Sequence, residues 1–218
     1  MKHIQRIAQK YQWLGSALWI SSLQFFVVQL IVASAWTTPF YYGMHYISDL
    51  GNTTCGPFAG LYVCSPLHWL MNLSFVVFGV TIALGAALLY KTFRPNALST
   101  IGFGLLVLSG IGTVLVGLAP ENVNSLVHYI GAVLGLLLGN IALLFIGVGL
   151  TQTPRYYRLY TIVTGVVCVA AFTLFANDIH HFTGLGRGTV ERIVSYPFTV
   201  WLIVSGVYFG FVRNKTKK

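Results

Sequence analysis

The chain has 218 residues, of which 56% are hydrophobic and 8% are charged, and its mean hydropathy is +0.76. This composition excludes an ordinary water-soluble domain, because too few polar residues are present to cover its surface. The formal net charge of +9 does not indicate nucleic-acid binding, since the basic residues fall between apolar stretches and not along one face. The sequence therefore predicts a membrane protein whose partner is membrane lipid, with no nucleic acid.

The apolar residues gather in stretches of about 20, the length that an α-helix needs to cross roughly 30 Å of hydrocarbon. The first stretch is about twice as long as the core of a usual signal peptide, so we expect an uncleaved span. Six spans are predicted in one integral membrane domain, residues 1–218, at about 11–36, 66–90, 98–118, 126–150, 159–176 and 193–212. The predicted fold is all-α, a polytopic transmembrane bundle of six helices.

The basic residues predict the orientation of this bundle. If the amino and carboxyl termini are both cytoplasmic, 11 of the 13 basic residues lie on the cytoplasmic side, and only Arg187 and Arg192 lie outside. A cytoplasmic excess of Lys and Arg is what orients helices during insertion. All four acidic residues and five of the six histidines then fall at the outer ends of spans. We therefore expect a multi-pass protein of the cell membrane with an extracytoplasmic polar cluster.

The cysteines and glycines suggest how the chain is held together. Cys55 and Cys64 share a loop in a compartment that this topology makes oxidising, which predicts a disulfide, with two free thiols as the alternative. Cys168 lies in an apolar stretch and is expected to pack in the core. The third and fourth spans are rich in glycine, which predicts close packing at the centre of the bundle. A homodimer seam through these spans is the competing interpretation.

The first polar segment reads His-Tyr-Ile-Ser-Asp-Leu-Gly at 45–51, in the loop after the first span. If this segment is helical, His45 and Asp49 share a face at four-residue spacing. They would then be a metal-ligand pair, or a catalytic base and its orienting acid. The structural alternative is that Ser48 or Asp49 caps a turn closed by Gly51.

The second polar segment lies between the third and fourth spans and contains Glu121, Ser125 and His128. Glu121 and His128 are candidate catalytic residues because ionisable groups at the membrane boundary are costly and usually face a cavity or each other. Ser125 and His128 can meet at three-residue spacing as a nucleophile and its base. The alternative for Ser125 is an N-cap of the fourth span, which we favour.

The third polar segment precedes the sixth span. Together with His68 it supplies a candidate metal-ligand set drawn from several helices: His68, Asp178, His180 and His181. Imidazoles and carboxylates of this kind suit zinc or another divalent metal that activates water. No strict ligand motif occurs, so interfacial polar residues are the alternative. Haem held by His68 and His128 is not favoured.

Three motifs of the chain resemble a membrane family known as domain of unknown function 998. They are the segment at 45–51, the Gly-Leu-Ala-Pro-Glu turn at 117–121 followed by His128, and Val190-Glu191-Arg192 leading to Tyr196-Pro197 and Trp201. The likeness extends over about 11–212. The Ile-Ser-Asp-x-Gly stretch at 47–51 is also distantly similar to the Frag1, DRAM and Sfk1 group of six-span proteins. That second likeness implies a shared bundle and lipid-related work, not a particular reaction.

Three functions fit these features. The first is an enzyme that acts on a lipid or amphiphile through an outward-facing His and carboxylate pocket, as in a metal-assisted hydrolase. In it Ser48 and Glu191 contact substrate, and Arg187 or Arg192 holds an anionic headgroup. The alternative is a non-catalytic lipid-binding scaffold or accessory subunit. A small-molecule transporter is third, since the spans lack mid-membrane charge and inverted repeats.

Overall fold

The computed structural model describes residues 2–90, 96–177 and 184–212, with side chains from residue 10 to residue 211. Within this part, six helical stretches are long and apolar enough to cross a membrane, which confirms the predicted fold class. These stretches are Lys10–Ser34, His68–Tyr90, Ala97–Leu118, Ser125–Gly149, Arg155–Ala176 and Arg187–Phe211. They contain the helices α1 (Lys2–Ile20), α2 (Leu23–Ser34), α3 (His68–Tyr90), α4 (Ala97–Leu118), α5 (Ser125–Ala132), α6 (Gly139–Gly149), α7 (Arg155–Ala176) and α9 (Arg187–Val207).

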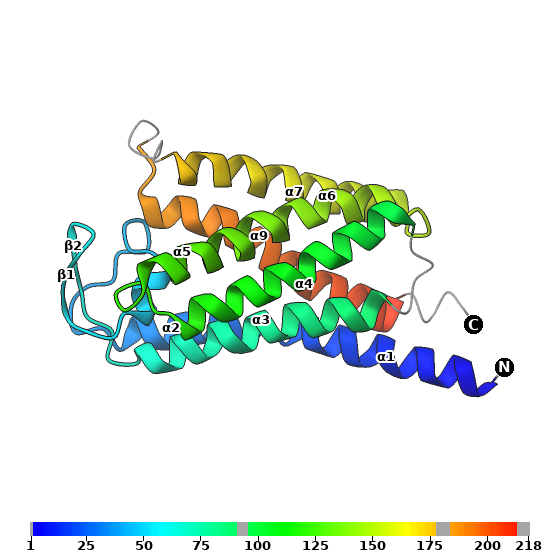
Figure 1. Cartoon of the computed structure of the whole chain (residues 1–218), viewed down its shortest axis with the longest axis horizontal. Coiled ribbons are helices and arrows are strands. Elements are labelled where there is room, and N and C mark those ends of the chain that lie inside the picture. The colour runs from blue at the N-terminus through cyan, green and yellow to red at the C-terminus, as the bar shows by residue number, and fades with distance from the viewer. Residues whose placement is uncertain (1, 91–95, 178–183, 213–218) are drawn as a thin grey trace.

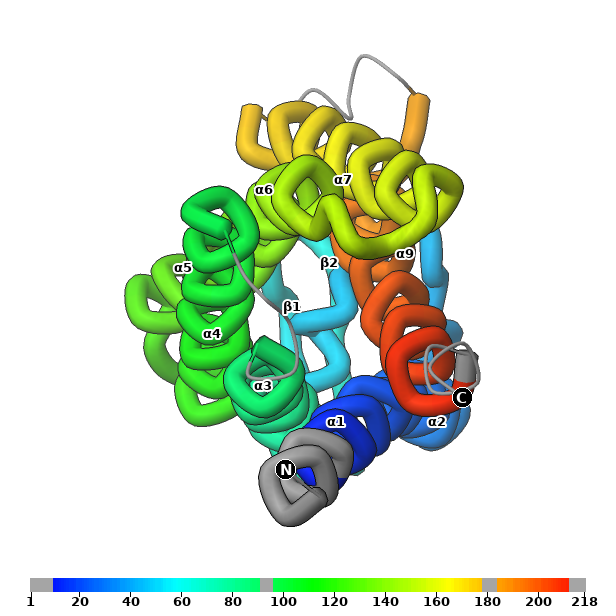
Figure 2. The backbone as a smooth tube through the Cα atoms, turned by 90° about the vertical axis from the view of Figure 1, so that its right-hand side faces the viewer, coloured from blue at the N-terminus to red at the C-terminus, as the bar shows by residue number. Residues whose placement is uncertain are grey.

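The spans form a closed ring, in which each packs against the next along the chain. The circuit runs from α1 to α3, α4, α6, α7 and α9, and α9 returns to pack on α1. Figure 2 shows this ring from the end at which the chain begins and ends. Large buried side chains fill its centre, among them Trp19, Phe103 and Trp201. The core therefore lies inside the ring, and apolar residues on the outside remain for lipid.

The first span is broken into α1 and α2 by Ser21 and Ser22, a feature that the apolar pattern did not reveal. The Ser21 hydroxyl donates to the Leu18 carbonyl at 2.7 Å, and the Ser22 N–H bonds to Trp19 O three residues back. Side-chain competition for backbone carbonyls at adjacent serines is a known cause of helix kinks. After the break, α2 continues toward the end of the bundle that carries the hairpin (Figure 1).

Two spans begin earlier than predicted. Helix α7 starts at Arg155 and not near residue 159, and α9 starts at Arg187 and not near residue 193. Hydropathy placed both starts after the charged residues. Arg158 stays helical because its guanidinium bonds to the Gly147 and Val148 carbonyls at the end of α6. Glu191 and Arg192 stay helical because they bond to the loop that follows α2, as described below.

Glycines on α4 let its backbone touch both neighbouring helices. A Cβ atom placed on Gly110 would lie 2.5 Å from the carbonyl oxygen of Gly79 in α3. A Cβ on Gly112 would lie 2.7 Å from the carbonyl oxygen of Gly131 in α5. These glycines are used within the chain, at the close approaches that small residues allow in lipid. The homodimer seam remains a prediction.

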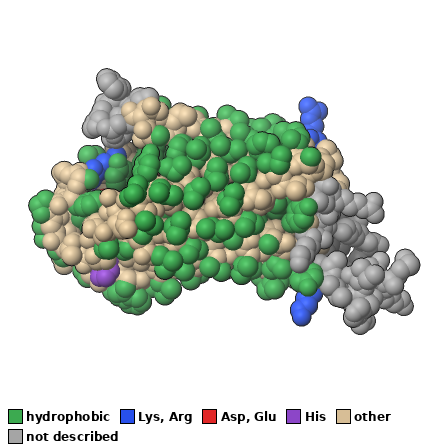
Figure 3. All heavy atoms as spheres, in the orientation of Figure 1, with side chains coloured by type: hydrophobic (Ala, Val, Ile, Leu, Met, Phe, Trp, Pro, Cys, Tyr) green, Lys and Arg blue, Asp and Glu red, His purple; other side chains and the backbone are tan. Residues whose placement is uncertain are grey.

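One end of the bundle is capped by loops and a small hairpin, and α1 begins at the other (Figure 1). The hairpin pairs β1 (Gly56–Phe58) with β2 (Leu61–Val63) in antiparallel register, and the predicted Cys55–Cys64 disulfide closes it. Cys168 is buried, as expected. In Figure 3 hydrophobic side chains cover the middle of the visible face, and no carboxylate of the described residues is seen there. Among the described acidic residues, Asp49 and Glu191 are buried and Glu121 is half-buried.

Candidate functional site

The site is built around the loop segment at 46–53, which lies at the end of the ring that carries the hairpin. Its 3₁₀ turn η1 (Ser48–Gly51) carries two side chains, Ile47 just before it and Leu50 within it, into the core. Side chains of α3 and of the preceding loop fix its backbone. The Asn72 amide donates to Gly51 O at 2.9 Å, and the Ser65 hydroxyl donates to Leu50 O at 2.6 Å. The loop therefore presents fixed polar groups to the interior.

Ser48 and His128 form a hydrogen-bonded pair. The His128 ring joins Ser48 Oγ through Nε2 at 3.0 Å and the Ala119 carbonyl through Nδ1 at 2.9 Å. A carbonyl can only accept, so Nδ1 carries the proton in the neutral ring, and Nε2 accepts from the Ser48 hydroxyl. His128 is therefore in the tautomer required of a base toward Ser48.

Asp49 and Glu121 bring two carboxyl groups together. Asp49 is fully buried and accepts from the Tyr46 N–H at 2.7 Å through Oδ2. Its Oδ1 and the Oε1 of Glu121 are both buried without a hydrogen-bond partner, and the two carboxyl groups interact electrostatically. Two neighbouring carboxyl groups repel each other when both are ionised, so this arrangement favours a proton on one of them.

The pKa of Glu121 is raised well above its ordinary value, first because the group is buried and then because of the Asp49 charge and hydrogen bond. The charge of Glu191 adds to this rise, and the guanidinium of Arg187 opposes it. Glu121 is therefore held as a neutral acid at a pH where an exposed glutamate is ionised. A neutral acid can donate a hydrogen bond to a substrate oxygen.

Glu191 and Arg192, at the start of α9, bind the loop from the opposite wall. The Ile47 N–H donates to Glu191 Oε2. Arg192 Nη1 donates to the carbonyls of Tyr42, His45 and Gly188 at 2.7, 2.8 and 2.8 Å. These bonds explain why two charged residues lie buried inside a helix that the hydropathy pattern began later.

Ser48, Glu121, His128 and Glu191 line one cavity of about 380 Å³ between α5 and α7. The rest of its wall is largely apolar and comes from the loop, the hairpin, α5, the π-helical turn η2 (Val133–Leu138) and α7: Tyr46, Phe58, Ser125, Tyr129, Ala132, Val133, Leu136, Phe172, Phe175 and Ala176. Tyr129 and Ala176 are exposed on the outside of the bundle. The cavity thus has polar groups at the loop and an apolar wall that reaches the outside of the bundle, as is typical of ligand sites. The π-helical turn η2 is a further feature that is frequent at functional sites.

Other predicted site residues lie elsewhere. His45 does not pair with Asp49: its Nδ1 accepts from the Tyr41 N–H at 3.0 Å, and its ring stacks on Phe40. Arg187 lines a separate hollow beside the hairpin, and Arg192 lines another beside Tyr196. His68 lies at the start of α3. It lines neither the hollow beside the hairpin nor the cavity that contains Ser48 and His128.

The expected N-cap at Ser125 is wrong by one residue. The N-cap of α5 is Asn124, whose side chain accepts from the Val127 N–H at 3.1 Å. An N-cap side chain accepts from the N–H three residues further along the chain, which Asn124 does. Ser125 is already the first residue of the helix, so it cannot take this role.

The predicted metal site falls largely outside the described residues. Asp178, His180 and His181 are not among them, so the metal assignment remains a prediction. Within the ranges that the structure describes, no three His, Cys, Asp or Glu side chains gather as metal ligands. His128 uses both ring nitrogens for contacts within the chain.

Sequence reasoning missed the partner of His128. It paired His128 with Ser125 by local spacing, whereas the structure pairs it with Ser48, 80 residues away in the chain. The motif at 45–51 and the position of His128 drew attention to both residues. No spacing rule joins residues that meet only through the packing of different spans.

The ring of apolar helices with a buried polar loop defines a multi-pass helical membrane protein. The chain belongs to the DUF998 family of proteins of unknown function, whose model matches residues 19–208. Searches of curated proteins and of solved structures found no match. The likeness to the Frag1, DRAM and Sfk1 group remains a prediction.

Proposed function

We propose that this protein is a membrane-embedded enzyme that transfers or hydrolyses an ester-linked acyl group of a lipid or other amphiphile. The observation that supports it most is the cavity in which the Ser48 and His128 pair and Glu121 adjoin an apolar wall. A polar reacting group would lie against the loop while hydrocarbon contacts the helices. Such a pocket, apolar with a few convergent polar groups, is typical of ligand sites.

The proposed chemistry assigns one role to each group. Ser48 Oγ attacks the ester carbonyl carbon while its proton passes to His128 Nε2. The protonated Glu121 carboxyl donates to the carbonyl oxygen as negative charge develops there. The C–O bond to the alcohol breaks, and His128 returns the proton to the leaving oxygen. Water then cleaves the acyl-serine through the same base, which restores the Ser48 hydroxyl and releases the carboxylic acid.

The experiment uses the full chain in nanodiscs with short-chain p-nitrophenyl esters and a fluorophosphonate probe. We expect ester turnover and labelling of Ser48, both lowered at least 100-fold in Ser48→Ala and His128→Ala, in the range typical of general-base loss. Ser125→Ala is the matched control, because Ser125 lines the same cavity without bonding to His128. Turnover that survives Ser48→Ala, or none in the wild type, would contradict the proposal.

The same contacts also support a second, non-catalytic function, in which they only hold the loop in place. The Ser48 and His128 bond also ties the loop to α5, and Glu191 ties it to α9, as a non-catalytic lipid-binding scaffold would require. In that case Ser48→Ala and His128→Ala would lower the melting temperature with no turnover to lose. Ester turnover in the wild type separates the two functions.

A further inference from the structure

A second cavity lies beside the first, deeper in the ring. It has a volume of about 60 Å³ and adjoins the larger cavity through four residues that line both: Ser48, Ala132, Leu136 and Glu191. Its remaining wall comes from Ile47, Gly135 of η2, and residues of α2, α3, α4 and α9. We call this space the inner chamber. It extends the candidate site toward the middle of the bundle.

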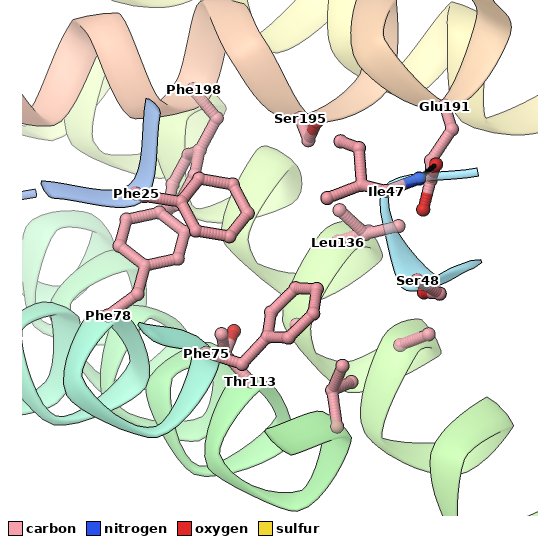
Figure 4. A pocket seen from close by; sticks show the side chains of 13 residues that line it. Phe25, Ile47, Ser48, Phe75, Phe78, Thr113, Leu136, Glu191, Ser195 and Phe198 are labelled. Atoms are coloured by element: carbon pink, nitrogen blue, oxygen red, sulfur yellow. Dashed lines mark hydrogen bonds between the residues drawn. The ribbon is translucent and has the colours of Figure 1, made fainter. Parts of the chain in front are cut away.

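The two ends of the inner chamber differ in chemistry. Figure 4 shows Phe25, Phe78 and Phe198 gathered on one side, with Ser48 and Glu191 on the other. At the aromatic end the Phe25 and Phe78 rings stack with centroids 4.5 Å apart. Apolar cavities of this kind stay dry and take apolar ligands. The polar end coincides with the proposed reacting residue.

We propose that the inner chamber receives the end of a short hydrocarbon chain whose ester group lies at Ser48. This inference rests on the proposed function, because it uses Ser48 to place the reacting end of the substrate. The chain enters from the larger cavity past the Leu136 side chain. The substrate class is therefore an amphiphile with one acyl chain held inside the protein, not lying along its outer surface.

The volume of the chamber limits the length of that chain. A single water needs about 10–15 Å³ of cavity, so a space of about 60 Å³ holds only a few groups of that size. A methylene group is close to that size. We therefore expect an optimum at about six acyl carbons and a steep fall for much longer chains.

Ser195 is suited to a test of this limit. It lines the chamber, and its buried Oγ has no hydrogen-bond partner, so a larger apolar residue there fills space without breaking a bond. Ser195→Leu narrows the chamber, and Ser195→Ala is the matched control that leaves it open. Thr113 lies on the α4 wall, so Thr113→Leu with Thr113→Val repeats the comparison if Ser195→Leu fails to fold.

The experiment photolabels the full chain in nanodiscs with N-acyl amides that carry a diazirine at the last carbon, with chains of about six and twelve carbons. We expect the shorter probe to label the α3 and α9 peptides that contain Phe78 and Phe198. Ser195→Leu should lower this labelling at least fivefold and shift the ester optimum to about two or three carbons. Ser195→Ala, which adds no bulk, should change the labelling and the ester optimum far less than Ser195→Leu does.

Labelling confined to the lipid-facing side of α7, at residues such as Val163 and Val167, would overturn the inference. Equal labelling in Ser195→Leu and wild type would do the same. The amide probe needs no hydrolysis, so the two proposals fail separately. Chamber labelling without ester turnover would contradict only the enzyme. Turnover without a chain-length shift would contradict only the chamber.

Discussion

Ile47, Ser48 and Asp49 are consecutive, yet each has a partner from a different part of the chain. The Ile47 N–H bonds to Glu191, Ser48 bonds to His128, and Asp49 pairs with Glu121. Ile47 uses its backbone N–H just before the 3₁₀ turn, and within the turn the side chains of Ser48 and Asp49 point in different directions. At the scale of single residues, the site depends on how this turn is held.

The Asp49 and Glu121 pair predicts an unusual pH dependence of stability. The folded state raises the pKa of Glu121, so it binds this proton more tightly than the unfolded state does. The contribution to the unfolding free energy is complete below the ordinary glutamate pKa of about 4.5, and is lost as the pH rises through the raised value. Melting temperatures in detergent should therefore fall with rising pH above about 4.5.

Glu121→Gln should flatten this pH profile, because a glutamine binds no proton in either state. Asp49→Asn supplies the control: it removes the neighbouring charge, so the fall should persist but move to lower pH. Identical profiles in wild type and Glu121→Gln would show that the pair does not share a proton.

At the scale of elements, α4 is the helix whose sequence is most constrained by its neighbours. Gly110 and Gly112 approach the backbones of α3 and α5, while Gly104 has no atom of another residue within 4 Å of a built Cβ. The glycines therefore differ in what they do, although a composition count treats them alike. Only those at close backbone approaches set the spacing of the ring.

Gly110→Ala should lower the unfolding free energy, whereas Gly104→Ala should not. In Gly110→Ala the new methyl group would lie 2.5 Å from Gly79 O, so the two helices must separate, at a cost of about 1–3 kcal/mol of unfolding free energy. Gly104→Ala should be neutral or stabilise by up to about 1 kcal/mol, because alanine favours helix. Denaturant unfolding in mixed micelles measures both. Equal losses of unfolding free energy in the two variants would contradict this account of the contact between α3 and α4.

At the scale of the whole molecule, the hairpin joins the disulfide to the candidate site. Phe58 in β1 lines the cavity, and Arg187 at the start of α9 donates to the Ala59 carbonyl at the hairpin tip. The Cys55–Cys64 bond fixes the base of the same hairpin. The hairpin therefore forms part of the wall against which a substrate would pack.

Removing the disulfide should loosen this wall. For the Cys55→Ser and Cys64→Ser double variant we expect a loss of about 2–3 kcal/mol, as chain entropy gives for a loop with a sequence separation of 9. If the site hydrolyses esters, KM should rise severalfold with little change in kcat, because the hairpin does not contact Ser48 or His128 through a described hydrogen bond. The double variant and the reduced wild type should show the same unfolding free energy and the same KM. An unchanged KM would show that Phe58 does not help to hold substrate.

The predicted orientation is tested by placing a single new cysteine at an exposed position of the Cys55→Ser and Cys64→Ser double variant. Tyr62→Cys lies on the hairpin and Thr151→Cys on the connection between α6 and α7. The positive-inside rule predicts that a membrane-impermeant maleimide labels the first in intact cells and the second only after permeabilisation. The reverse pattern would place the candidate site in the cytoplasm.

The sequence alone determined that the chain forms six apolar helices, and it identified the polar segments. It could do so because span length and hydropathy are properties of consecutive residues. The sequence also marked Ser48, Asp49, Glu121, His128 and Glu191 as candidates, since charged and polar groups beside hydrocarbon are rare.

The tertiary structure decided which candidates meet. It paired His128 with Ser48 and not with Ser125, separated His45 from Asp49, and extended α9 to include Glu191 and Arg192. It also decided where the cavities lie. These features depend on how the ring closes, because contacts between distant spans follow from the packing of whole helices and not from any local spacing.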